Sequence, residues 1–300
     1  MNPAQRRPGP LAAALRILAG VAVYRLRRLE MANMGGALVI MLALRLPAPE
    51  LAVRLGFAFL LNLLVYLNND YLDLAADLRS PARDDATTRF LDEHRGAALG
   101  AQLGLVLALA AIALAWDLGL FVPLVVGGGI CWLYSARLKH VPGADIAAMA
   151  VWGAAMLTVA FPPTHALGWA LALLLALDSA VFETIQVIRD HDADRATGVR
   201  TTAVALGVPS TLALARALLV LGAGAAALAI HPLAAAPPLI AVTLPLGRPH
   251  RYWNRVRLLL GVAFLFAAGH VYLHGRTAGI AVQCRPDGCF LAPVFSDSSR

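Results

Sequence analysis

The stretch LGFAFLLNLLVYLNNDYLDLAAD, from Leu55 to Asp77, begins as an apolar run and ends in a cluster of amides and carboxylates. On an α-helix, Asn69, Asp73 and Asp77 stand four residues apart and share one face, and Asp70 lies beside them. Carboxylates stacked in this way repel one another unless a cation sits among them, and oxygen ligands favour a hard cation such as Mg2+. A solvated helix end is the simpler alternative for this stretch taken alone.

A second acidic cluster, Asp190-His191-Asp192-Ala193-Asp194, follows another long apolar run. Its Asp190 and Asp194 again share one helical face. Two such clusters, each at the end of a membrane-length helix, predict two walls of one site that holds Mg2+ between them. Because Mg2+ usually completes its shell with water and phosphate oxygens, the substrate that we expect is a diphosphate.

The composition indicates an integral membrane protein of one domain, residues 1–300. Of the 300 residues, 59% are hydrophobic and 14% are charged, and the mean hydropathy is +0.69, well outside the range of soluble domains. We expect no removable signal peptide and an interfacial helix at 11–24. Nine apolar stretches have about the length that a bilayer requires: 31–46, 51–69, 97–115, 118–136, 144–162, 166–188, 211–230, 232–247 and 257–274.

The basic residues predict the orientation of these spans. Most of the 25 lysines and arginines fall in the N-terminal tail and in the loops after the even-numbered stretches. By the positive-inside rule, both acidic clusters and the N-terminus (1–30) face the cytoplasm, and the tail 275–300 lies outside. The net charge of +7 therefore indicates topology rather than nucleic-acid binding. The polar segment 78–95 is long enough to form a cap over a cytoplasmic site.

The three cysteines give no metal site. Cys131 lies inside an apolar stretch and is most simply a packing residue. Cys284 and Cys289 flank Arg-Pro-Asp-Gly in the tail, where a disulfide and two free thiols are both open.

Several polar residues inside apolar stretches are candidate substrate contacts. Ionisable groups within a membrane span are functional candidates, and Glu183, Gln186, Asp190 and Asp194 form one helical stripe that we expect to line a cavity. Asp178 lies deeper and is either part of that cavity or a paired structural charge. The predicted cavity residues are Asn62, Tyr66, Gln186 and Asp178.

The sequence resembles the UbiA superfamily of intramembrane prenyltransferases. Its members carry an NDxxDxxxD-type motif, here from Asn69 to Asp77, and a DxxxD motif followed by GxRT, here from Asp190 through Gly198, Arg200 and Thr201. Many also carry YSxxLK after the fourth span, which this chain has in 134–139, ending in its only lysine. The resemblance covers about residues 25–275.

That resemblance implies nine transmembrane helices around a central cavity, with a cytoplasmic cap and an opening to lipid. It implies two Mg2+ ions, held by Asn69, Asp73, Asp77, Asp190 and Asp194. The diphosphate ligands that we expect are Lys139, Arg137, Tyr134, Ser135, Arg83 and Arg200. Lys139 would assist departure of the diphosphate, and Asp70 or Glu183 would accept the proton of the acceptor.

The predicted reaction is transfer of a prenyl group from an isoprenyl diphosphate to an acceptor, which in this family is most often aromatic, in a bacterial cytoplasmic membrane. Many relatives follow the first motif with a P-x-R-P-[LI]-x-x-G-like segment, of which this chain keeps only Pro81 and Arg83. The difference leaves open a membrane terpene cyclase, which needs no acceptor. A transporter is disfavoured because the acids gather at span ends without broken-helix repeats, and a lipid phosphotransferase because its DGxxAR-type motif is missing.

Overall fold

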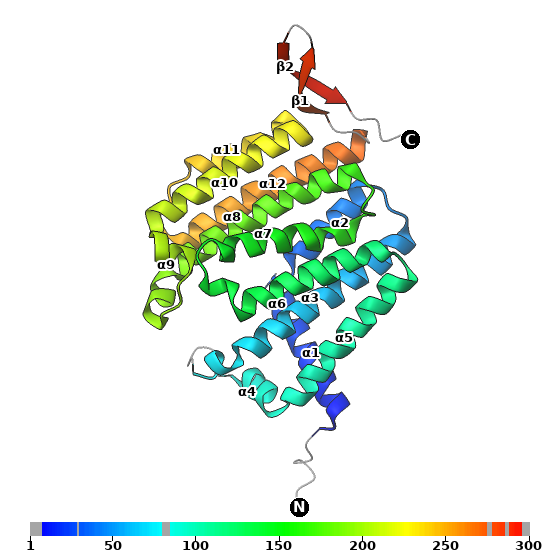
Figure 1. The fold of residues 1–300 in the computed structure, drawn as a ribbon, viewed down its shortest axis with the longest axis vertical. Coiled ribbons are helices and arrows are strands. Elements are labelled where there is room, and N and C mark those ends of the chain that lie inside the picture. Colours follow the sequence, from blue (N-terminus) through cyan, green and yellow to red (C-terminus); the bar gives the residue numbers. More distant parts are fainter. Residues whose placement is uncertain (1–7, 29, 80–84, 275–277, 286–287, 296–300) are drawn as a thin grey trace, which may run out of the picture.

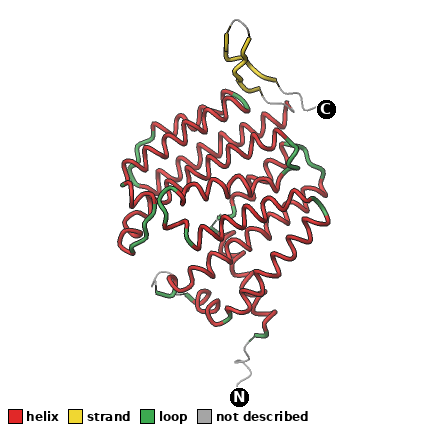
Figure 2. The backbone as a smooth tube through the Cα atoms, viewed as in Figure 1, coloured by secondary structure: helices red, strands yellow, loops and turns green. Residues whose placement is uncertain are grey.

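The computed structural model describes residues 8–28, 30–79, 85–274, 278–285 and 288–295, the last two segments by their backbone alone. Helices run side by side through most of the chain (Figures 1 and 2). The α-helices are α1 (Pro10–Arg27), α2 (Ala32–Ala43), α3 (Ala48–Asp77), α4 (Ala86–Glu93), α5 (Arg95–Ala115), α6 (Gly128–Ala136), α7 (Ala144–Leu157), α8 (Ala166–Thr197), α9 (Thr202–Leu206), α10 (Val208–Ala229), α11 (Ala236–Thr243) and α12 (Pro249–His274). Short helical turns join them: η2 (Leu118–Leu120), η3 (Pro123–Gly127), η4 (Leu138–His140), η5 (Thr158–Ala160) and η6 (Pro232–Ala235).

Six helical segments of the described chain are long and apolar enough to cross a membrane: Ala48–Ala75, Arg95–Ala115, Leu118–Ala136, Ala166–Thr197, Val208–Ala229 and Pro249–His274. Three further apolar helices are shorter, Ala32–Ala43, Ala144–Ala160 and Pro232–Thr243. Each of these nine segments coincides with one of the apolar stretches in the sequence. The helical architecture and the six long apolar helices are those of a multi-pass membrane protein.

The tail differs from the all-helical expectation, because β1 (Ala278–Arg285) and β2 (Gly288–Phe295) form an antiparallel hairpin beyond α12 (Figure 1). The register pairs the backbones of Cys284 and Cys289. Their side chains lie outside the described residues, so the disulfide stays a prediction. The Pro-Asp-Gly sequence at 286–288 is typical of a turn between two strands.

The apolar interior is divided between two large clusters of buried residues. One joins α1, α3 and α5 through side chains such as Ile17, Leu61 and Leu109. The other joins α2, α8, α10 and α12 through side chains such as Ile40 and Leu171. Helices α3 and α8 therefore belong to different clusters, and these are the helices that carry the two acidic motifs.

Helix α8 packs without room for an added methyl group at two glycines, one on the neighbouring α7 and one in its own first turn. A Cβ on Gly153 of α7 would collide with Ser179 of α8, and one on Gly168 of α8 would collide with the ring of Phe161. Backbones approach this closely only where one residue lacks a side chain, a common device between membrane helices. The contact fixes α8 firmly against α7.

At the end of the bundle far from the acidic motifs, a buried arginine forms ion pairs with two carboxylates. Arg54, near the start of α3, is 2% exposed and pairs with Glu50 at 2.6 Å and Asp117 at 2.6 Å. It also donates to the carbonyl of Val159 at 3.1 Å. Partial burial by itself raises the pKa of Asp117, but the hydrogen bond from Arg54, the backbone N–H of Gly119 and the charge of Arg54 together lower it below the ordinary value.

Acid should therefore destabilise the protein partly through Asp117. Because the pKa of Asp117 is lower in the folded chain, its ionised form contributes stability above the pKa of an unfolded aspartate, about 3.9, and that stability disappears as the pH falls through the folded value. In detergent, the thermal midpoint should fall less between about pH 5 and pH 3 in Asp117→Asn than in the wild type. Asp92→Asn, whose carboxylate pairs with Arg95 at an exposed position, is the control. Equal slopes for Asp117→Asn and the wild type would contradict the assignment.

Candidate active site

The first acidic motif occupies the last turns of α3, where its side chains are only partly buried. Asp73 forms an ion pair with Lys139 of η4. One turn earlier, the amide oxygen of Asn69 accepts a hydrogen bond from Ser135 Oγ of α6 at 3.0 Å. The segment from α6 to η4 therefore lies along the acidic face of α3, and the residue spacing that put Asn69 and Asp73 on one face is what allows one segment to contact both.

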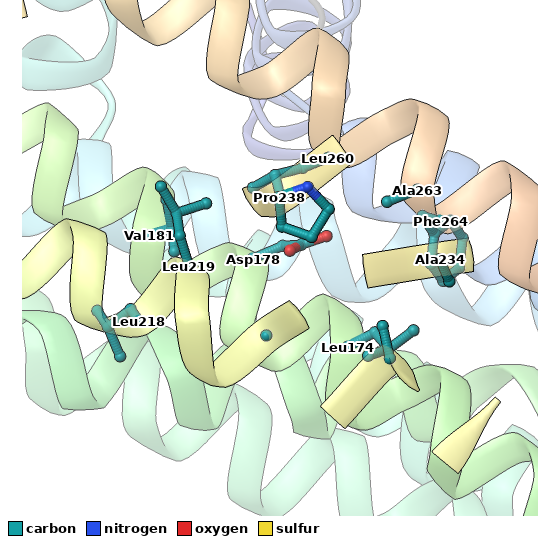
Figure 3. A pocket seen from close by; sticks show the side chains of 12 residues that line it. Leu174, Asp178, Val181, Leu218, Leu219, Ala234, Pro238, Leu260, Ala263 and Phe264 are labelled. Carbon is teal, nitrogen blue, oxygen red and sulfur yellow. The ribbon is translucent and has the colours of Figure 1, made fainter. Parts of the chain in front are cut away.

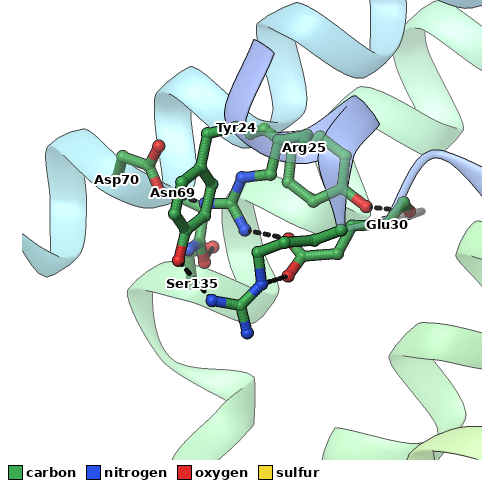
Figure 4. Close-up of polar contacts among 8 residues, drawn as sticks. Tyr24, Arg25, Glu30, Asn69, Asp70 and Ser135 are labelled. Carbon is green, nitrogen blue, oxygen red and sulfur yellow. Dashed lines mark hydrogen bonds and ion pairs between the residues drawn. The ribbon is translucent and has the colours of Figure 1, made fainter. Parts of the chain in front are cut away.

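Asp70 points instead toward α1 and the turn that follows it (Figure 4). Its carboxylate pairs with Arg25, which also binds Glu30 at 2.5 Å. Burial by itself lowers the pKa of Arg25, but Asp70 and Glu30 raise it above the ordinary value, so the guanidinium stays charged. The hydroxyl of Tyr66 donates to the Glu30 carbonyl. The Asp70 carboxylate is thus engaged by Arg25, and its role as proton acceptor stays a prediction.

Arg25 and Glu30 were not predicted as site residues from the sequence, in which the basic residues of the N-terminal segment served only to predict topology. Glu30 also interacts electrostatically with Arg189 of α8. The turn between α1 and α2 therefore contacts α3 and influences α8 through the charge of Glu30. The available signal was Glu30, the acidic residue that follows the arginines of 25–28, because a carboxylate beside several arginines is expected to form an ion pair.

The second acidic motif forms the end of α8. Arg189 donates two hydrogen bonds to Asp190, from Nε at 2.8 Å and from the terminal guanidinium at 2.9 Å. Asp194 accepts from Thr201 Oγ at 3.2 Å. The chain returns to Asp194 because Gly198 ends α8 with φ 75°, a left-handed conformation that glycine adopts without strain. The glycine and threonine of the GxRT motif thus fold back onto the aspartate that precedes them.

Deeper in α8, the buried carboxyl of Glu183 accepts a hydrogen bond from the Tyr134 hydroxyl at 2.9 Å. Tyr134 precedes Ser135, which reaches the opposite acidic helix. Segment 134–139 therefore bridges the two walls: Tyr134 contacts α8, while Ser135 and Lys139 contact α3.

Asp145, on the first turn of α7, is a third residue that was not predicted from the sequence. Its side chain is 0% exposed and accepts from the backbone N–H of Thr202 at 2.7 Å and from the Thr202 hydroxyl. Thr202 Oγ in turn accepts from the Gly143 N–H at 2.6 Å. These bonds fasten the start of α9, directly after Thr201, to α7. A lone carboxylate in an otherwise apolar stretch was the signal that could have found it.

The donors around the two motifs fit a hard divalent cation in kind, because they are carboxylate and amide oxygens with partly exposed side chains. In the described part of the chain, no three His, Cys, Asp or Glu side chains converge closely enough to hold a metal ion. Instead, Lys139 neutralises Asp73 and Arg189 neutralises Asp190. The metal ligands named from the sequence, Asn69, Asp73, Asp77, Asp190 and Asp194, remain predictions.

The other predicted site residues are dispersed. Arg137 and Arg200 are exposed near the acidic motifs, and Gln186 is exposed on α8. Asn62 is fully buried and donates to the carbonyl of Ala58 at 2.8 Å. Arg83 lies outside the described residues.

Asp178 lines a separate small cavity between α8, α10 and α12, with its carboxyl near Pro238 (Figure 3). Five residues along a helix turn the side-chain direction by about 140°, so Asp178 points away from the side of α8 on which Glu183 meets Tyr134. Among the described residues Asp178 has no ion-pair partner. Its assignment to the substrate cavity stays a prediction.

The family model of the UbiA prenyltransferase family matches residues 33–266. The chain therefore belongs to that family. No curated protein sequence matches the chain.

Solved structures share the fold. A UbiA homologue from Archaeoglobus fulgidus bound to DMAPP and Mg2+ aligns with a TM-score of 0.61 and 16% identity, over 87% of this chain and 99% of that one. The same homologue bound to GPP and Mg2+ aligns with a TM-score of 0.54, 16% identity and the same coverage. A structure of digeranylgeranylglyceryl phosphate synthase aligns with a TM-score of 0.58 and 14% identity, over 85% and 98% of the two chains.

Proposed function

We propose that this protein is a Mg2+-dependent intramembrane prenyltransferase that ionises an isoprenyl diphosphate and transfers the prenyl group to an aromatic acceptor. The observation that carries the proposal is the bridge made by 134–139, whose Tyr134 contacts the helix of one acidic motif while Ser135 and Lys139 contact the other. A flexible ammonium between acidic walls suits a diphosphate, which brings negative charge and accepts hydrogen bonds. UbiA homologues of the same fold were solved with DMAPP or GPP and Mg2+.

The proposed arrangement has nine membrane-crossing helices, with the acidic ends of α3 and α8 on the cytoplasmic side of a bacterial membrane. Segment 78–95, including α4, would cap the site. The positive charge in the loops on that side supports this orientation. The three short apolar helices would cross by combining with the neighbouring turns η5 and η6 or where the bilayer thins locally.

The residues of the chain would act on the diphosphate end of the substrate. Asn69, Asp73, Asp77, Asp190 and Asp194 would hold Mg2+, whose charge stabilises the departing diphosphate. Lys139, which now neutralises Asp73, would donate to a diphosphate oxygen, and Arg137, Arg200, Arg83, Tyr134 and Ser135 would complete its surroundings. The allylic C–O bond then breaks heterolytically, with the electron pair leaving on the diphosphate.

Glu183 is the better placed of the two proposed proton acceptors. It lies deeper along α8 than Asp190, contacts a neutral hydroxyl and forms no ion pair with a described residue, whereas Asp70 is neutralised by Arg25. After the acceptor attacks the allylic cation through its ring carbon, the ring proton would pass to Glu183, which restores aromaticity. Asn62 and Tyr66 of α3 and Gln186 of α8 would border the prenyl chain, whereas Asp178 lines the separate cavity beside α10 and α12.

The alternative is a terpene cyclase, in which a double bond of the substrate attacks the cation. The observation that supports a cyclase is the sequence of 80–89, which departs from the prenyltransferase pattern.

Product analysis separates the two. Purified protein in lipid receives Mg2+ and prenyl diphosphates of increasing length, first without an acceptor and then with phenolic acceptors. The prenyltransferase proposal predicts diphosphate release only in the second series. Release with a cyclic hydrocarbon or alcohol in the first series would establish the cyclase. No release in either series would overturn the two-wall site.

A further inference from the structure

A second cavity, of about 310 Å³, opens at the end of the bundle far from the acidic motifs. It lies where α2 and α12 end and α8 begins, on the side from which the hairpin extends (Figure 1). Its lining residues are Ala43, Leu44, Arg45, His165, Leu167, Val271, Leu273 and His274. At about 30 Å³ per water molecule in the liquid, this volume corresponds to roughly ten waters. It is therefore large enough for a small polar group.

Three nitrogen-bearing side chains from three parts of the chain meet in this cavity: Arg45, His165 and His274. The described lining contains no carboxylate, so no acidic side chain there neutralises the arginine. Arg45 donates to the carbonyl of Tyr272 at 2.8 Å, which leaves most of its five N–H groups for other acceptors. His274 Nδ1 lies 3.0 Å from the carbonyl of His270. Because a carbonyl only accepts, Nδ1 donates, and Nε2 becomes a second donor when the ring is protonated.

The backbone of Arg45 is held in an unusual conformation. Its φ of 55° is the only positive value among the described residues other than glycine. A left-handed conformation is costly for a residue with a side chain, and such residues gather at functional positions. Here it turns the chain sharply between α2 and α3, at the residue whose guanidinium reaches the end of α12.

The start of α8 reinforces the positive character of the cavity. No side chain caps this 32-residue helix at His165, so the first backbone N–H groups of α8 lack a side-chain acceptor, and Leu167 of that first turn lines the cavity. A long helix carries partial positive charge at this end. The ends of α2 and α12, which also border the cavity, carry the opposing partial charge. Arg45 donates to the Tyr272 carbonyl at the end of α12, and the last carbonyls of α2 accept from the backbone N–H groups of the turn that follows it.

We infer that this cavity binds a phosphate group, either free or as the headgroup of an anionic phospholipid. The guanidinium matches two phosphate oxygens at once, while the imidazoles and helix start supply further donors. The lining includes an exposed apolar side chain, Leu273 at 71%, and the neighbouring Leu42 is also exposed. Such a surface suits acyl chains. Trp169 and Tyr272 are also exposed nearby, and these aromatic residues favour the interface between lipid and water.

This site is distinct from the proposed active site. His165 and Asp190 are 25 positions apart on α8, which is about 38 Å of helix. The inference therefore does not depend on the proposed reaction, and binding is measured without any prenyl substrate.

The test uses native mass spectrometry of the full chain in detergent with phosphatidylglycerol, phosphatidylcholine or inorganic phosphate. We expect phosphatidylglycerol to bind at least ten times more tightly than phosphatidylcholine. Displacement of it by millimolar inorganic phosphate would show that the phosphate group alone suffices. Retention would show that the lipid is the source. Equal binding of both lipids, without binding of inorganic phosphate, would overturn the inference.

Variants of the lining residues test whether phosphatidylglycerol binds in this cavity. Arg45→Gly removes the guanidinium and suits the positive φ, and it should weaken phosphatidylglycerol binding at least tenfold, whereas Arg45→Lys should retain most of it. His165→Gln changes a ring that forms no hydrogen bond with another described residue. It provides a second variant should Arg45→Gly fail to fold, and it should weaken binding several-fold. Arg257→Gln on α12 is the control for lost charge, since Arg257 stacks on Trp253 away from the cavity. Unchanged binding in both Arg45→Gly and His165→Gln would overturn the inference.

Discussion

Replacement of Asp73 by asparagine is expected to reduce prenyl diphosphate turnover by about 1,000-fold, equivalent to about 4 kcal/mol of transition-state stabilisation, and to leave the protein folded. Asparagine keeps the size of the side chain but removes the charge that a divalent cation requires. Asp73 is partly exposed, and its partner Lys139 is also partly exposed. The ammonium that loses its ion pair therefore remains hydrated, and the cost in stability is small.

The measurement is diphosphate release at increasing Mg2+ concentration. A ligand role predicts that Asp73→Asn needs more Mg2+ for half-maximal activity, a shift that a purely structural role would not produce. Asp92→Asn makes the same charge change at an exposed position beside Arg95 and should behave as wild type. Turnover within tenfold of the wild type in Asp73→Asn would show that this carboxylate is not part of the site.

Replacement of Asp145 by alanine is expected to give the largest loss of stability, about 3 kcal/mol. The carboxylate is 0% exposed and is the acceptor for both donors of Thr202. Its removal leaves a buried N–H and a buried hydroxyl without this partner, and the loss of each costs free energy because water cannot replace it. Thermal unfolding in detergent should show a midpoint several degrees lower.

A double-mutant cycle with Thr202→Val identifies the origin of the loss. If the Asp145–Thr202 contact carries the stability, the double variant should be destabilised by clearly less than the sum of the single effects. Asp92→Ala, which removes an exposed carboxylate, should leave the midpoint unchanged. Additive effects of Asp145→Ala and Thr202→Val would show that the two side chains act independently.

Much of the fold follows from the apolar pattern of the sequence. The stretch 51–69 lies within α3 and 166–188 within α8, because a helix with enough apolar surface to cross a bilayer leaves a long signal in composition. The boundaries were less predictable. Helix α3 continues to Asp77 through the acidic motif, and the stretch 232–247 is divided into η6 and α11, with α11 ending at Thr243.

The candidate site was predictable where local spacing determines geometry. The four-residue interval between Asn69 and Asp73 places both toward α6 and η4, and the glycine of the GxRT motif returns Thr201 to Asp194. Contacts between distant segments were not predictable in this way. Arg25 meets Asp70 across 45 residues and Asp145 meets Thr202 across 57, and such partners are chosen by how the helices pack rather than by neighbouring residues.

The close packing of α7 against α8 determines more than the distance between the two helices. Ser179 of α8 packs against Gly153 of α7, and Gly168 of α8 packs against Phe161 in the loop between the two helices. Rotation of α8 about its long axis would force these atoms to overlap. The direction in which each side chain leaves α8 is thereby determined, including the directions of Asp190 and Asp194 near the other end of the helix. The directions of the two carboxylates therefore depend on the absence of a Cβ atom at Gly153 and Gly168.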